Sequence, residues 1–226
     1  MKPENRPIMK NDSLLRAEAL LTGGNIFNRN KKDPYGNLSA NYIKAGEMGL
    51  KGSLELINDQ SKLSDLAIGR SNMAVAGCEV IAVYNLLKRY GRGARAVELP
   101  DLIECFERSG VMLGGRFGVS SRAMADFLRS MGLKTNFTSD PSDFDVLGQY
   151  CSDLILTVMN DRTNIFKQIH TIYVSREDAP DGAYYFRPYN AGLRDRFSSI
   201  DDLIKALPGG KASGISLIGV SGESRY

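Results

Sequence analysis

The spacing of apolar and polar positions divides the chain into a helical first part and a strand-rich second part. Apolar residues recur at helical spacing over 76–90, 98–110 and 118–133. After residue 150 the pattern changes to short runs rich in Ile, Val, Thr, Tyr and Phe, separated by Asn, Asp, Gly and Pro. These runs are predicted strands at 153–159, 168–175, 183–188 and 213–221, with one more helix at 198–207. Helices followed by strands predict the α+β class.

Local signals predict where these helices begin, end and face the core. Gly91 is a good stop for the helix at 76–90, and Pro100 suits the first turn of the helix at 98–110. Hydroxyl side chains that can cap a helix lie near the start of the helices predicted at 118–133 and 198–207. The first of these helices has an apolar stripe that is expected to be buried. The capping candidates are Ser120 or Ser121 and Ser198 or Ser199, and the stripe is Met124, Phe127, Leu128 and Met131.

The first 55 residues have a weaker pattern. Residues 21–42 are dense in Gly, Asn, Lys and Pro, which predicts a loop. Short helices are predicted on either side, at 13–21 and within 38–59, with Ser39 as the cap of the second. We therefore expect residues 1–55 to form an N-terminal extension packed on a main domain of residues 56–226.

Composition narrows the function classes only slightly. The chain has 226 residues, of which 42% are hydrophobic and 24% charged, and its net charge is +3. This is ordinary globular composition, and the charge bias is too small to argue for nucleic-acid binding. No signal-peptide core and no run of about 18 apolar residues is visible, so we expect a cytoplasmic protein without a membrane span. No nucleotide-binding motif is present, and no cofactor is expected.

The cysteines and the histidine are the candidate chemistry. The chain has three cysteines, Cys78, Cys105 and Cys151, and one histidine, His170. An odd number of cysteines without a close pair describes neither a disulfide framework nor a zinc site, and one histidine excludes a His-rich metal site. Cys105 lies in an amphipathic helix and Cys151 opens the strand region, so both are predicted to be structural.

Cys78 differs because it follows Gly77 and begins a predicted helix without a capping side chain. Backbone amides at a helix N-terminus favour a thiolate, so a lowered thiol pKa is predicted. A cysteine nucleophile also needs an imidazole within hydrogen-bond reach. His170 is the only imidazole in the chain, and on a strand it would share a face with Ile172 and Val174.

Three segments in order resemble a known family. They are "AGCEVIAVYNLLKRYG", "GGRFGVSSRAMADFLRSMGLK" and "HTIYVSREDAPDGAYYFRPYNAG", which together lie within residues 70–195. They resemble papain-like cysteine peptidases, and most of all the bacteriocin-processing, double-glycine leader peptidases of bacteria. The resemblance implies a papain-like fold, in which an N-terminal helical half carries the cysteine helix and packs on a C-terminal antiparallel β-sheet.

The resemblance also implies roles for individual residues. Cys78 matches the nucleophile and His170 the general base. Asn72, six residues before the cysteine, matches the side chain that contributes to the oxyanion hole. The family has an Asp or Asn on the next strand that orients the imidazole. Arg187 stands at that position, and Asn190 is the nearest suitable group.

Three functions follow from these expectations. The first is a thiol hydrolase that cleaves a peptide or isopeptide bond in a peptide or protein substrate through Cys78 and His170. The second is a catalytically inert papain-like fold used as a binding module or partner subunit, which Arg187 favours. The third is acyl transfer by the same pair, since hydrolysis and transfer share their first half-reaction. The pattern of residues does not indicate an oligomeric state.

Overall fold

The computed structural model describes residues 31–90, 97–161 and 169–221. In these residues the chain forms seven α-helices, three short 3-10 helices and two antiparallel sheets. The helices are α2 (Leu38–Glu47), α3 (Met73–Ala76), α4 (Cys78–Tyr90), α5 (Leu99–Ser109), α6 (Ser121–Ser130), α7 (Phe144–Tyr150) and α8 (Ile200–Ala206), with 3-10 helices η2 (Gln60–Leu63), η3 (Leu113–Gly115) and η4 (Pro141–Asp143). The strands are β1 (Ala67–Ile68), β2 (Ser71–Asn72), β3 (Lys134–Thr138), β4 (Asp153–Met159), β5 (Ile169–Asp178), β6 (Tyr184–Tyr189) and β7 (Ser213–Ser221).

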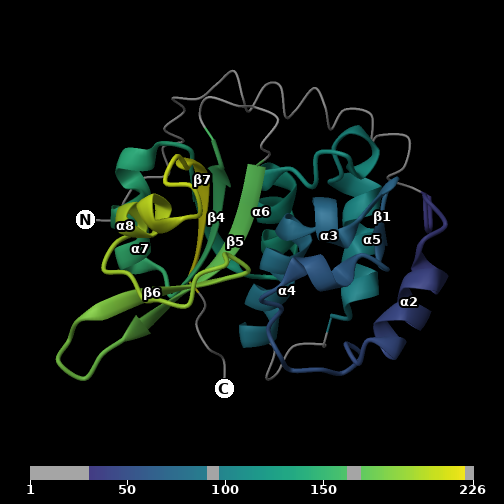
Figure 1. Cartoon of the computed structure of the whole chain (residues 1–226), viewed down its shortest axis with the longest axis horizontal. Helices are drawn as coiled ribbons and strands as arrows, with labels where there is room; N and C mark the ends of the chain where they lie inside the picture. Colours follow the sequence, from purple (N-terminus) through teal and green to yellow (C-terminus); the bar gives the residue numbers. More distant parts are fainter. Residues whose placement is uncertain (1–30, 91–96, 162–168, 222–226) are drawn as a thin grey trace.

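The larger sheet is the middle layer of the molecule. Its strand order is β3-β7-β4-β5-β6, and β1 and β2 form a separate hairpin. Helices α3, α4, α5 and α6 lie on one side of this sheet, and α7 and α8 lie on the other (Figure 1). Helix α2 packs on α5 at the outer margin of the helical layer. The class predicted from the sequence, α+β, is therefore confirmed.

A hydrophobic core lies on each face of the larger sheet, because successive side chains of a strand point to opposite faces. From the central strand β4, Ile155 packs in the core that contains α4, α5 and α6. Its neighbours Leu154 and Leu156 pack in the core that contains α7 and α8. The strand is consequently apolar on both faces, which explains the nearly continuous apolar run "DLILTVM".

Most predicted elements are confirmed within a residue or two of their expected ends. Ser120 caps α6 by accepting a hydrogen bond from the Ala123 amide at 3.0 Å, and Ser199 caps α8 in the same way. The predicted helix at 13–21 and the stop at Gly91 lie outside the described residues. No helix in the described ranges combines the length and the apolar character needed to cross a membrane.

Two local predictions are wrong. Asn37, and not Ser39, occupies the N-cap position of α2, two residues earlier than the hydroxyl pattern indicated. Met131 is 40% exposed and does not belong to the buried stripe, because α6 ends at Ser130 and Met131 is already its C-cap. The pattern also missed β3, a short edge strand with polar residues at Lys134 and Asn136, and the seven-residue helix α7.

Candidate active site

Cys78 is the first residue of α4, and its side chain is only 5% exposed. The helix lies against β5, and the amide of Thr171 donates a hydrogen bond to the Cys78 sulfur. Arg176 directs its amide toward β4, where the carbonyl of Ser152 accepts it. Because amides alternate along a strand, Thr171 directs its own amide toward the opposite edge of β5. The thiol therefore lies at that edge.

At the position of the thiol, β6 does not pair with this edge of β5. Strand β6 pairs with β5 only from the Tyr173–Tyr189 pair onward toward Asp178. Residues 169–172 extend beyond the last pair, and Asn190 follows directly after the end of β6. The nucleophile candidate, the strand that carries His170 and the orienting candidate Asn190 therefore meet at one place in the fold.

The electrostatic surroundings of Cys78 differ from those that the sequence predicted. Burial, and next the negative charge of Glu79, raises the pKa of the Cys78 thiol well above its ordinary value. The thiol also donates to the Glu79 carboxylate, which further favours the protonated form. The Thr171 amide acts in the opposite direction but is outweighed. The predicted lowering of the thiol pKa is therefore wrong, because the helix N-terminus is buried beside a carboxylate.

The imidazole of His170 is anchored by backbone. Its Nε2 lies 2.6 Å from the carbonyl oxygen of Asn190. A carbonyl oxygen can only accept, so Nε2 carries the proton and Nδ1 is the basic nitrogen of the ring. Burial lowers the pKa of His170, and the hydrogen bond to Asn190 partly offsets this effect. The histidine is consequently neutral at pH 7, with a fixed tautomer.

The thiol and the imidazole approach the edge of β5 from different sides. Alternation puts His170 on the side of Ile172 and Val174, whose side chains pack toward α7 and α8. In the described parts of the chain, the two groups form hydrogen bonds to other residues: the thiol to Thr171 and Glu79, and the imidazole to Asn190. The resting site thus holds a neutral thiol and a neutral imidazole rather than an ion pair.

Asn190 reaches His170 through its backbone and uses its side chain for a different contact. Its φ is +61°, a left-handed conformation that Asn tolerates better than most residues. Its side-chain oxygen accepts a hydrogen bond from the backbone amide of Gln60 at 3.0 Å, and its side-chain nitrogen donates to Gln60 Oε1 at 2.9 Å. Asn190 is therefore held by Gln60, and its carbonyl in turn holds the imidazole.

Asn72, the predicted oxyanion-hole residue, ends β2 and caps α3. Its Oδ1 accepts a hydrogen bond from the amide of Val75 at 3.0 Å. Helix α3 leads directly into Gly77 and Cys78, so the cap fixes the path of the chain into the nucleophile position. The carbonyl oxygen of Ala74, within α3, accepts a hydrogen bond from Gln60 Nε2 at 2.8 Å.

Arg187 does not lie beside the imidazole. It faces Ser175 in the β5–β6 register, five residues from His170 along β5. Its guanidinium pairs with Glu177 at 3.5 Å and lies over the ring of Tyr189, with 5.5 Å to the ring centroid. The position at which the resembling family has its Asp is thus an exposed ion pair in this chain.

Sequence reasoning missed three residues of this region: Gln60, Glu79 and Thr171. Glu79 could have been found, because an acidic residue next to the cysteine opposes thiolate formation. Thr171 follows His170 directly and acts through its amide, which no side-chain pattern reports. Gln60 has no sequence signal, since its partner Asn190 is 130 positions away.

The other two cysteines lie apart from this region. Cys105 is partly buried on α5 and Cys151 is fully buried, and all three thiols are free. Burial raises the pKa of both thiols. Across the described ranges, no group of three or more His, Cys, Asp or Glu side chains is arranged to hold a metal ion.

Comparison of the sequence with protein-family models and with curated proteins finds no match.

Proposed function

We propose that the protein is a thiol hydrolase of papain-like type that cleaves a peptide or isopeptide bond. One observation carries the proposal: the imidazole of His170 is fixed by the Asn190 carbonyl in the tautomer that makes Nδ1 basic. A structural histidine on a strand does not need a defined basic nitrogen. A general base does, and the sulfur of the candidate nucleophile, Cys78, accepts a hydrogen bond from the amide of Thr171, the residue that follows His170 on β5.

The neutral resting pair sets the order of the steps. When substrate binds, the Cys78 thiol gives its proton to His170 Nδ1 while its sulfur attacks the carbonyl carbon. The Cys78 amide and the side-chain amide of Asn72 would stabilise the oxyanion. The imidazolium then protonates the leaving amine, and water hydrolyses the thioester with His170 again as base. Before the first proton transfer the imidazole must move from its resting position to reach the sulfur.

A peptidyl vinyl sulfone tests this proposal because its adduct requires an activated thiol. We expect one adduct per chain by intact-protein mass spectrometry, on Cys78, and none in Cys78→Ser. His170→Ala should lose most of the labelling while Cys105 and Cys151 stay unmodified in all variants. Cleavage of a quenched-fluorescent peptide library should follow the same ranking. Added hydroxylamine would reveal acyl transfer as a hydroxamate product.

A second candidate, a papain-like fold that binds a partner without catalysis, is supported by the raised pKa of the buried Cys78 thiol. It predicts no adduct on Cys78 under native conditions, and equal labelling of the three thiols only after unfolding. That result would remove the hydrolase and leave the binding module.

A further inference from the structure

We infer that Gln60 is a positioning residue that joins the two halves of the candidate site. It stands at the start of η2, before α3, which Asn72 caps, and α4, which begins with Cys78, and it contacts both halves at once. This inference rests on the proposed function, and it assigns the residue that sets the relative position of the imidazole and the thiol.

The first arm of the contact reaches the β half of the site. The backbone amide of Gln60 donates to Asn190 Oδ1 at 3.0 Å, and Gln60 Oε1 accepts a hydrogen bond from Asn190 Nδ2 at 2.9 Å. Asn190 is buried and turns the chain at φ +61°, so its carbonyl direction depends on how its side chain is held. That carbonyl is the acceptor for His170 Nε2. Gln60 therefore acts on the imidazole through one intermediate residue.

The second arm reaches the helical half. Gln60 Nε2 donates to the carbonyl oxygen of Ala74 at 2.8 Å. Ala74 lies within α3, between the cap at Asn72 and the thiol at Cys78. One side-chain amide thus uses its acceptor for one half and its donor for the other. Glutamine is the residue type for this task, because glutamate lacks the donor and lysine the acceptor.

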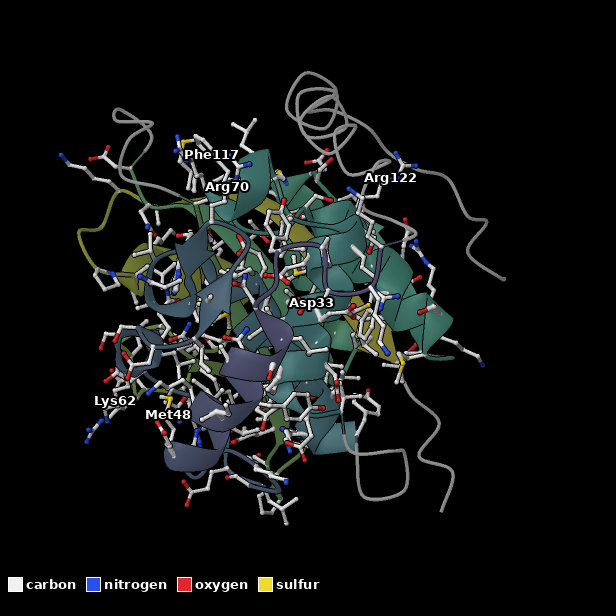
Figure 2. All side chains as sticks on the ribbon, turned by 90° about the vertical axis from the view of Figure 1, so that its right-hand side faces the viewer. Asp33, Met48, Lys62, Arg70, Phe117 and Arg122 are labelled. Carbon is white, nitrogen blue, oxygen red and sulfur yellow. The ribbon has the colours of Figure 1, made fainter. Side chains whose placement is uncertain are left out.

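The chain contains a matched control for this arrangement. Asn41 of α2 makes the same kind of reciprocal contact with the backbone of Ala67, at 2.8 and 2.9 Å, but at the outer margin of the helical layer. Lys62 offers a second control, since it belongs to η2 with Gln60. Its side chain is 77% exposed and extends outward at the margin of the molecule (Figure 2).

The test uses the single histidine as a probe in the full chain, labelled with ¹⁵N-histidine and carrying no histidine tag. We expect wild type to show an Nε2–H tautomer with a slowly exchanging ring proton. In Gln60→Ala this proton should exchange about threefold to tenfold faster, the change that corresponds to weakening one neutral hydrogen bond. The pKa of His170 should also fall, because the Asn190 carbonyl supports the protonated ring.

Asn190→Gly provides an independent variant that keeps the positive φ without strain and removes the side-chain arm. It should change the His170 signal in the same direction as Gln60→Ala. The double variant should show little more than either single one, since both remove the same contact. Gln60→Glu retains the acceptor for Asn190 and loses the donor to Ala74. It should therefore keep the His170 signal while the rate of Cys78 alkylation changes.

Several results would overturn the inference. One is a wild-type His170 signal in both Gln60→Ala and Asn190→Gly. Another is an equal change in Asn41→Ala or Lys62→Ala, because that would indicate general loosening. The His170 signal can be measured without turnover. If the signal changes in the Gln60 and Asn190 variants but Cys78 is inert, the role of Gln60 stands and the hydrolase proposal fails. If the protein is an active hydrolase but the signal stays at its wild-type value in these variants, the hydrolase proposal stands and the role of Gln60 fails.

Discussion

The two ends of α4 each hold a buried carboxylate, with different partners. Near its C-terminal end, the buried carboxylate of Asp153 accepts hydrogen bonds from the Tyr173 hydroxyl and from Ser152. The same carboxylate pairs with Arg89 at 3.3 Å. Each group there has a partner of complementary charge or donor type. This is the pattern of a structural network, in which burial and pairing agree.

At the N-terminal end of α4 a buried carboxylate again accepts a hydrogen bond, here from a thiol. The Cys78 thiol, an acid, lies beside the carboxylate of Glu79, another acid, and both are buried. Burial and this carboxylate raise the pKa of the thiol, as burial and Asp153 raise the pKa of Tyr173 at the other end. Perturbed pKa values occur in structural networks as well as at functional sites. The comparison teaches that contact between a weak acid and a buried carboxylate is common to both ends of this helix, and that the donor, a thiol instead of a phenol, distinguishes the candidate site.

The largest expected effect lies at the structural end. Asp153→Ala removes the carboxylate that three side chains contact, and leaves the Tyr173 hydroxyl buried without its acceptor. We expect a loss of about 3 kcal/mol in the free energy of unfolding, measured by urea denaturation. The His170 signal and the rate of Cys78 alkylation should stay at wild-type values. A loss below about 1 kcal/mol, or a changed His170 signal, would contradict the assignment of this end as structural.

The next largest effect is on thiol reactivity at the other end. Because thiol burial and Glu79 raise the pKa of Cys78, wild-type alkylation by iodoacetamide should increase through and beyond pH 9 without a plateau at low pH. Glu79→Gln removes the charge and should speed alkylation at pH 8 by about tenfold, which is roughly the effect of one hydrogen bond to a charged group. Partial labelling followed by peptide mass spectrometry reports each thiol separately.

Glu104→Gln is the matched control for that variant. Glu104 contributes to the raised pKa of Cys105 on α5, away from the site, and its replacement should leave the Cys78 rate unchanged. An acid-shifted plateau in wild-type Cys78 alkylation would show a thiolate–imidazolium pair and contradict the neutral thiol on which the comparison rests.

A smaller effect is expected on stability at mildly acidic pH. Burial lowers the pKa of His170 in the folded chain below its ordinary value of 6.5. The unfolded chain therefore binds the proton first as the pH falls, and stability present above about pH 6.5 is lost below it. Urea denaturation of wild type and His170→Gln between pH 5 and 7.5 measures this. The variant should lose less stability over that range, and identical pH dependence would show that His170 titrates alike in both states.

The sequence predicted the α+β class, α4 with Cys78 at its start, and the strand that carries His170, because each depends on local spacing. It also predicted that His170 shares a side with Ile172 and Val174. It could not predict how the residues of the site connect. Asn190 acts on His170 through a carbonyl, and Gln60 reaches Asn190 across 130 positions. Such contacts involve backbone atoms or distant partners, and neither leaves a pattern of residue types.

The smallest expected effect tests this limit of sequence reasoning at Arg187. If Arg187 stood beside the imidazole, its charge would disfavour imidazolium, and Arg187→Asp would raise Cys78 reactivity. In the structure the guanidinium instead pairs with Glu177 on an exposed surface, where ion pairs contribute little. We therefore expect Arg187→Asp to change the Cys78 alkylation rate by less than about twofold, a bound consistent with such a weak pair.

The variant Asn190→Gly, assayed beside Arg187→Asp, provides the positive control because it changes the group that holds His170. A several-fold rise in the Arg187→Asp rate, accompanied by a shift in the His170 titration, would mean that the charge acts on the imidazole from five residues along β5. The alignment with the family's Asp would then describe the site better than the hydrogen bond from Nε2 to Asn190. An unchanged titration with Arg187→Asp, together with a changed one in Asn190→Gly, would assign control of the imidazole to the backbone of Asn190.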